Sequence, residues 1–169
     1  MTAILVAGIG NIFNGDDAFG VEVAQRLMRR PQPHGVKIVD FGIRGLDLTY
    51  ALLDGFSAAI LIDAAARGER PGTVTIVEPT IQTQGDLQPE DLIVSGHDLD
   101  PAKVLQVVSA LGGGCRRIVL VACEPLDLGG EDGAMGLSPA VAAAIEPAVV
   151  TVERLIADFL KTQGLGEAA

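Results

Sequence analysis

Two adjacent aspartates follow the first apolar segment of the chain. Residues 3–7 are all apolar, as in a buried strand, and a glycine-rich turn leads to Asp16 and Asp17, which open a segment with helical periodicity. Positions 8, 10 and 13 read Gly, Gly and Phe, so the dinucleotide-binding fingerprint is incomplete, and two carboxylates would repel a phosphate at a helix N-terminus. The loop therefore favours a cation. The alternative is that Asp16 or Asp17 caps the following helix.

A third acid and a histidine extend this set. Asp63 ends the apolar run 56–64, where a carboxylate is costly unless it is ligated, paired or placed at a solvated rim. His97 directly precedes a predicted helix, and its alternative role is that of an exposed loop histidine. Two carboxylates and one imidazole suit a first-row divalent metal with open coordination positions. We therefore predict a metal site formed by Asp17, Asp63 and His97, and we assign no role to His34.

Residues for nucleophilic catalysis or for a conventional zinc protease are missing from the sequence. It contains neither a Gly-x-Ser-x-Gly elbow nor a His-Glu-x-x-His motif. Cys115 and Cys123 have no histidine nearby in sequence, and we expect both to be free thiols. Any hydrolytic chemistry must therefore use a sparse set of metal ligands.

Alternating strands and helices must position these side chains. We expect strands at 3–7, 35–41, 56–64, 73–78 and 116–122, and helices at 18–29, 46–53, 99–111 and from 138 to about 159. The near-continuous apolar strands predict an α/β fold, a three-layer α/β/α sandwich with a mostly parallel twisted sheet of about five strands. The alternating segment 73–78 should be an edge strand.

Ligands of such sheets bind beyond the carboxyl ends of the strands. Asp17 and Asp63 should therefore lie at the same sheet edge, close together if their strands are neighbours. The long polar loop 80–94 could bring His97 to that edge.

Composition narrows the possible partners. The 169 residues suit a single domain, 1–169, and carry 12 basic against 22 acidic side chains, which disfavours a nucleic-acid groove. Arg26, Arg29 and Arg30 are expected to interact with the dipole of their helix. With no basic leader and no apolar run of 18 residues, we expect a cytoplasmic protein without membrane contact. We also expect the protein to be a monomer.

The motif Gly8-Ile-Gly-Asn-Ile-Phe-Asn-Gly-Asp-Asp-Ala-Phe-Gly20 resembles the N-terminal signature of the hydrogenase maturation proteases. These endopeptidases trim the C-terminal extension from the large subunit of nickel–iron hydrogenases. Further blocks match in the same order and extend the resemblance over nearly the whole chain: Asp40-Phe-Gly-Ile-Arg-Gly-Leu46, Leu61-Ile-Asp-Ala64, Ser95-Gly-His97, Glu124-Pro125 and Gly136-Leu-Ser-Pro139.

The resemblance implies an α/β fold and a metal-binding trio at Asp17, Asp63 and His97. It implies that nickel arrives with the hydrogenase large-subunit precursor and that no organic cofactor is needed. Asp17, with Asp16 as the neighbouring candidate, would orient or activate water for peptide cleavage.

The turn block implies substrate contact through Gly42, Ile43, Arg44 and Gly45. The family often has Glu where this chain has Asp17, and Thr where it has Ile43, so metal position and target choice can differ here.

Three other functions remain open from the sequence. A nucleotide-binding module would share the strand–loop–helix start, although the glycine pattern and the two aspartates argue against it. A metal-dependent hydrolase of a small substrate would bind its metal tightly by itself. A noncatalytic assembly chaperone would grip the same precursor through the surface around residues 42–46.

Overall fold

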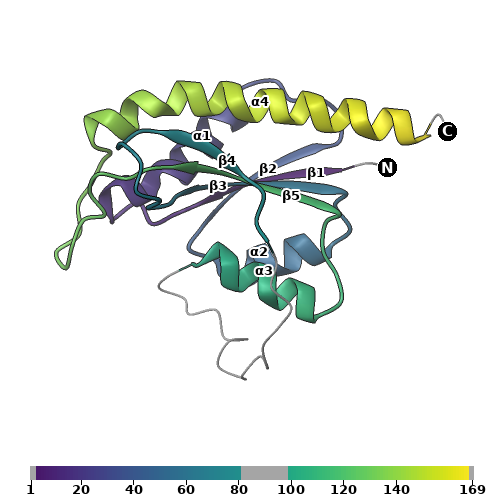
Figure 1. The fold of residues 1–169 in the computed structure, drawn as a ribbon, viewed down its shortest axis with the longest axis horizontal. Coiled ribbons are helices and arrows are strands. Elements are labelled where there is room, and N and C mark those ends of the chain that lie inside the picture. The colour runs from purple at the N-terminus through teal and green to yellow at the C-terminus, as the bar shows by residue number, and fades with distance from the viewer. Residues whose placement is uncertain (1–2, 81–98, 168–169) are drawn as a thin grey trace.

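The computed structural model describes residues 3–80 and 99–167 (Figure 1). The third predicted metal ligand, His97, and nearly all of the predicted loop 80–94 lie outside the described residues. In chain order the elements are β1 (Ile4–Ile9), the 3-10 helix η1 (Gly15–Ala18), α1 (Phe19–Met28), β2 (Val36–Gly42), α2 (Gly45–Leu53), β3 (Ala58–Ala64), β4 (Val74–Val77), α3 (Pro101–Ala110), β5 (Arg117–Cys123) and α4 (Pro139–Glu167).

The strands form one sheet in the order β2-β1-β3-β5-β4. β1 pairs in parallel with both β2 and β3, and β3 pairs in parallel with β5. The predicted edge strand is confirmed as β4, which pairs antiparallel with β5 at the margin of the sheet. β2 lies on one side of β1, and the later strands β3, β5 and β4 lie on the other side, so the strand order reverses at β1. In such sheets, ligands bind at this switch point, in the crevice beyond the carboxyl ends of β1 and β3.

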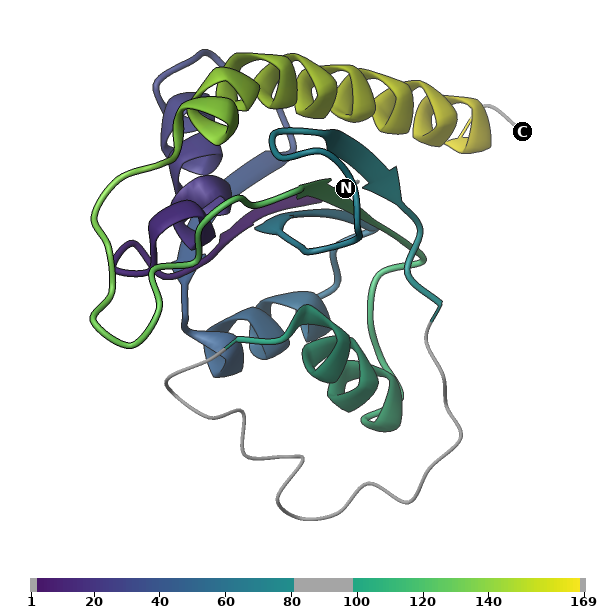
Figure 2. The ribbon, with the colours of Figure 1, turned by 60° about the vertical axis from the view of Figure 1, so that its left-hand side comes forward.

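Helices cover both faces of the sheet and confirm the three-layer sandwich. α1 and α4 lie on one face, and α2 and α3 on the other (Figures 1 and 2). Strand side chains alternate between the two cores. Ile4 and Val6 of β1 join the core under α1 and α4, whereas Leu5 and Ala7 join the core above α2 and α3.

The helices differ in detail from the predicted ones. α4 runs to Glu167, well beyond the predicted end near residue 159, and continues through Pro147. In α1 the predicted face of Phe19, Val23 and Leu27 is fully buried. Leu46 of α2 is 53% exposed. Within the described part of the chain, no helix combines the length and the apolar character needed to cross a lipid bilayer.

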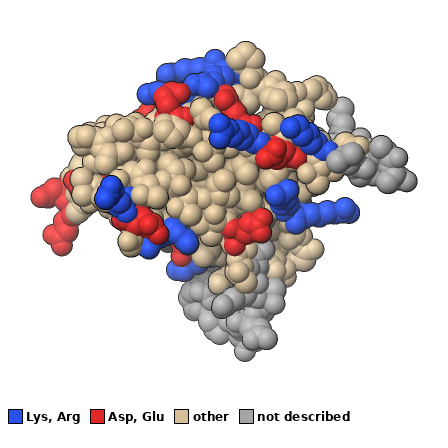
Figure 3. Space-filling view, turned by 45° about the horizontal axis from the view of Figure 1, so that its top comes forward, with Lys and Arg blue, Asp and Glu red and all other residues tan. Residues whose placement is uncertain are grey.

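The arginines at the end of α1 have partners that the sequence did not suggest. Arg26 and Arg30 each lie 2.8 Å from a carboxylate oxygen of Glu146, and Arg30 lies 3.2 Å from Glu153, so α1 is tied to α4. On the face drawn in Figure 3, basic and acidic side chains are interspersed. The predicted role of these arginines at the helix end is therefore incomplete, because they also pair with a second helix.

Candidate active site

Close packing of α1 on the sheet brings Asp17 and Asp63 to one edge. A Cβ at Gly20 would overlap the carbonyl oxygens of Ile62 and Ile9, and a Cβ at Gly8 would lie 2.5 Å from the Gly20 carbonyl oxygen. Gly20 thus sits against the residue that precedes Asp63, one helical turn after Asp17. The 3-10 helix that contains Asp17 also contacts β3. Asp17 and Asp63 were expected to lie close together if their strands are neighbours, and β1 and β3 pair directly.

Asp17 is held by the loop that follows β1. Its Oδ2 accepts a hydrogen bond from the Asn11 N–H at 3.0 Å, and the Asn11 Oδ1 accepts one from the Phe13 N–H at 2.9 Å. Gly10 adopts φ +148°, and a Cβ there would overlap the Asp17 carbonyl group. The glycines of this motif therefore serve close backbone contact around Asp17.

Asp63 and Glu124 occupy the carboxyl ends of neighbouring strands β3 and β5. Asp63 is 7% exposed and Glu124 is 8% exposed. The Glu124 Oε2 accepts a hydrogen bond from the Arg67 N–H at 2.7 Å, which fixes the segment that leaves β3. Sequence reasoning gave Glu124 no role, although an acid closing an apolar strand is the same signal that identified Asp63.

Asp16 is fully buried, in contrast to its neighbour Asp17. Its Oδ2 accepts hydrogen bonds from the N–H groups of Leu126 and Asp127 at 2.8 and 2.9 Å and from the Ser138 hydroxyl at 2.9 Å. Its Oδ1 accepts the Ser138 N–H at 2.7 Å. Burial alone would raise the pKa of Asp16, but these bonds together hold the pKa below its usual value.

The alternative of helix capping by either aspartate is wrong. Asp16 and Asp17 lie inside the 3-10 helix, whose N-cap is Asn14, and α1 has Ala18 at its N-cap. Four donors thus hold the Asp16 carboxylate in place, and its predicted part in activating water stays a prediction. The predicted catalytic role of Asp17 likewise stays a prediction.

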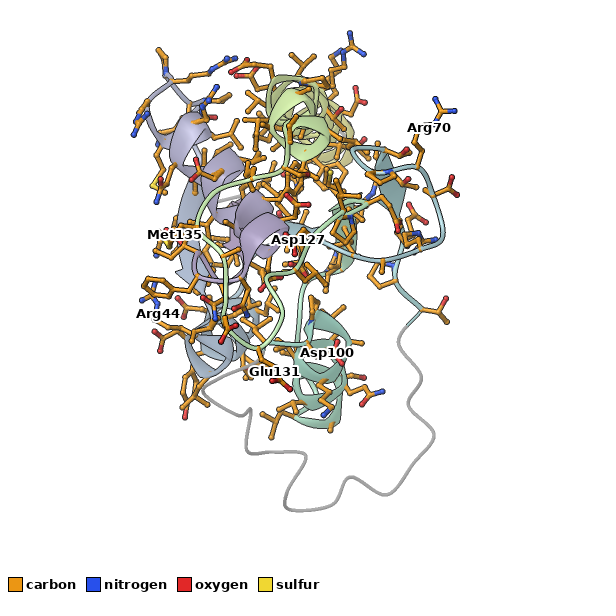
Figure 4. The ribbon with its side chains drawn as sticks, turned by 90° about the vertical axis from the view of Figure 1, so that its left-hand side faces the viewer. Arg44, Arg70, Asp100, Asp127, Glu131 and Met135 are labelled. Atoms are coloured by element: carbon orange, nitrogen blue, oxygen red, sulfur yellow. The ribbon has the colours of Figure 1, made fainter. Side chains whose placement is uncertain are left out.

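Backbone hydrogen bonds join the loop 10–16 to the loop 124–138. The N–H of Gly15 donates to the Ala134 carbonyl, the N–H of Ala134 donates to the Phe13 carbonyl, and the N–H of Asp16 donates to the Asp127 carbonyl, each at 2.8 Å. Figure 4 views this edge of the molecule and shows the second loop running across it, from Asp127 past Glu131 to Met135.

The predicted substrate-contacting turn 42–45 lies at the same edge. The N–H of Gly10 donates to the Gly42 carbonyl at 2.9 Å, which links this turn to the loop of Asp17. Arg44 is exposed; its guanidinium donates to the carbonyl oxygens of Asp40 and Phe41 and lies 3.3 Å from a carboxylate oxygen of Asp47. The turn thus presents an oriented cation. Substrate contact by Gly42, Ile43, Arg44 and Gly45 stays a prediction.

The metal-binding trio also stays a prediction. Asp17 and Asp63 are brought to one edge, but His97 lies outside the described residues. Within residues 3–80 and 99–167, no three His, Cys, Asp or Glu side chains gather closely enough to hold a metal ion.

Known proteins share both the sequence and the fold of this chain. A family model described as hydrogenase maturation protease matches residues 21–155. The hydrogenase expression/formation protein HupD of Bradyrhizobium diazoefficiens is 34% identical over 160 residues, which cover 92% of this chain and 79% of that relative.

Solved structures agree with this match. The hydrogenase maturating endopeptidase HybD from Escherichia coli superposes with a TM-score of 0.71 at 27% identity, over 93% of each chain. The NiFe hydrogenase maturation protease HycI from Thermococcus kodakarensis superposes with a TM-score of 0.65 at 26% identity, over 92% of each chain. The chain therefore belongs to the hydrogenase maturation protease family and is a peptidase.

Proposed function

We propose that this peptidase removes the C-terminal extension of a nickel–iron hydrogenase large-subunit precursor after nickel has been inserted. Family membership supports the reaction class, and a structural relative is named as a maturation protease of NiFe hydrogenase. The observation that supports the proposal is that Asp63 lies near the carboxyl end of β3, while Asp17 lies in the 3-10 helix that follows the neighbouring parallel strand β1 and contacts β3.

In this proposal nickel belongs to the substrate. Asp17, Asp63 and His97 supply two carboxylates and an imidazole, a donor set that suits a divalent first-row metal and leaves positions open for the precursor's own ligands. Bound nickel would polarise the scissile carbonyl. Recognition of the metal then couples cleavage to finished cofactor insertion.

The chain's own residues position the reactants. Asp17 has one carboxylate oxygen fixed by the Asn11 N–H, so the carboxylate is oriented before substrate binds. It accepts a proton from the water that adds to the scissile carbonyl and returns that proton to the departing amine as the carbon–nitrogen bond breaks. Gly42, Ile43, Arg44 and Gly45 contact the precursor beside that position.

The test is incubation of the purified protein with large-subunit precursor from the same cell, prepared with and without nickel. Mass spectrometry should detect loss of a C-terminal peptide from the nickel-loaded precursor and no loss from the nickel-free one. Equal cleavage of both preparations would contradict nickel recognition, and stable binding without cleavage would favour a chaperone. We expect the active species to be a monomer in the cytoplasm, which light scattering and cell fractionation would check.

A further inference from the structure

We propose that an apolar rim beside Asp17 is a docking surface for the precursor, and that it binds an apolar segment carrying positive charge. The proposal rests on the proposed function, because the precursor is the occupant. The rim consists of the exposed apolar side chains of the two joined loops: Ile12, Phe13, Leu126, Leu128 and Met135.

Exposed apolar side chains are concentrated at this edge. The described residues contain eleven large apolar side chains that are exposed, and five of them belong to the rim. Phe13, Leu126 and Met135 are 62%, 63% and 72% exposed. Several exposed apolar side chains on two joined loops indicate an interaction site, whereas single exposed apolar residues need no explanation.

The rim is held in place by hydrogen bonds to the buried Asp16 and by close backbone packing between the two loops. Asp16 accepts four hydrogen bonds from Leu126, Asp127 and Ser138, which pins both ends of the loop 124–138. Gly129 and Gly133 pack so closely on the first loop that a Cβ at either would come within 3.0 Å of the backbone of Asn14 or Phe13. An apolar surface fixed by a buried carboxylate loses little conformational entropy when it binds a partner.

The exposed charges of the loop 124–138 favour a positively charged occupant. Asp127, Glu131 and Asp132 are exposed on the same loop as Leu126 and Met135. Acidic side chains project at the end of the molecule where this loop lies (Figures 3 and 4). A second copy docking through the same patch would bring two acidic loops together, which is unfavourable. A segment with Lys or Arg beside apolar residues complements both features.

The rim also lies next to the reacting position. Phe13 donates its N–H to the Asn11 side chain, and Asn11 donates its N–H to Asp17. A precursor segment held on the rim therefore flanks the peptide bond presented to Asp17.

Steady-state cleavage of nickel-loaded precursor tests the rim with matched variants. Leu126→Ser combined with Met135→Ser should raise KM at least about tenfold and leave kcat within about twofold, because the lost contacts bind the substrate and do not act in the chemical step. Leu111→Ser is the matched control, since Leu111 is 60% exposed but ends α3, away from the rim. It should leave KM unchanged.

The charge requirement has its own variants. Glu131→Lys should raise KM severalfold at low salt, and the effect should shrink as salt is added. Asp158→Lys changes the same charge on exposed α4 surface and should leave KM unchanged.

The outcomes separate the two proposals. If the wild-type protein does not cleave loaded precursor, the proposed function fails. If it cleaves and the rim variants match the Leu111 control in KM, the docking surface alone is overturned. Rim variants that dissociate a wild-type dimer and keep the normal KM would assign the rim to a second copy and also overturn the proposal.

Discussion

Asp16 and Asp17 are adjacent in the chain but face different surroundings. The Asp16 carboxylate is enclosed and binds the loop after β5, whereas the Asp17 carboxylate is partly exposed and is oriented by Asn11. The donors to Asp16 lie 110–122 residues further along the chain, so these hydrogen bonds could not be predicted from the sequence. Local sequence patterns contain no information on such contacts.

Asp16→Asn should destabilise the fold by about 3 kcal/mol. In the wild type, the buried donors around Asp16 face a carboxylate. The asparagine amide would present N–H groups to some of these donors, so buried hydrogen bonds to a charged group are lost. Urea unfolding would measure the loss. Asp127→Asn, at an exposed acid that accepts the Gly129 N–H, should cost less than about 1 kcal/mol. Equal losses in the two variants would contradict the anchoring role.

The two cysteines are free, as the sequence predicted, and both are protected from ionisation. Burial raises the pKa of each thiol to about 11, and the charges of Asp16 and Glu124 contribute at Cys123. Native thiols should therefore react with iodoacetamide about a hundredfold more slowly at about pH 8 than the same thiols in urea. Labelling at equal rates in both states would contradict this.

The same pKa shifts predict that the folded protein is less stable at alkaline pH. The unfolded thiols lose their protons near their ordinary pKa of 9.0, whereas the folded thiols have a pKa of about 11. The contribution of these groups to stability is therefore complete below 9 and declines as the pH rises between these values. The urea midpoint of the wild type should fall as the pH rises across this range. The midpoint of Cys123→Ala should fall less steeply.

At the scale of elements, the position of α1 on β1 and β3 depends on two glycines. Gly8 and Gly20 allow backbone contact that any side chain would prevent. This contact sets the height of the first helical turn above the sheet, and with it the position of Asp17 relative to Asp63. The packing of one helix thus determines the geometry of the candidate metal site.

Gly20→Ala should destabilise the protein by about 3 kcal/mol or more and lower cleavage activity, because the new methyl group overlaps two carbonyl oxygens. Gly164→Ala is the matched control. Gly164 lies in α4 with open space around it, so alanine should stabilise by up to about 1 kcal/mol through helix propensity. Thermal unfolding of both variants checks the prediction, and similar losses would contradict it.

At the scale of the whole molecule, the sequence predicted the layers and the sheet better than the contacts. Apolar runs such as 56–64 and the alternation in 73–78 report burial directly, so the strands and the edge strand followed from them. The length of α4 and the exposure of Leu46 did not follow, because both depend on what the rest of the fold covers. The rim was missed for the same reason.

Asp17 and Asp63 could be singled out because each acid ends or follows an apolar strand and the parallel topology places such residues at one edge. The roles of Asp16 and Glu124 required the tertiary structure, since their partners belong to other elements. Acids that look alike in the sequence therefore divide into anchoring and candidate metal-binding groups only after folding.

We propose that Asp17, Asp63 and His97 together carry nickel-dependent cleavage. The most direct measurement is the rate at which nickel-loaded precursor releases its C-terminal peptide with Asp17→Asn, Asp63→Asn or His97→Ala, each compared with Asp158→Asn. We predict that the cleavage rate falls at least about a hundredfold for each of the three variants and is unchanged for the control. Thermal unfolding should show that all four variants are folded. A folded Asp17→Asn or Asp63→Asn variant that cleaves at the wild-type rate would contradict the account.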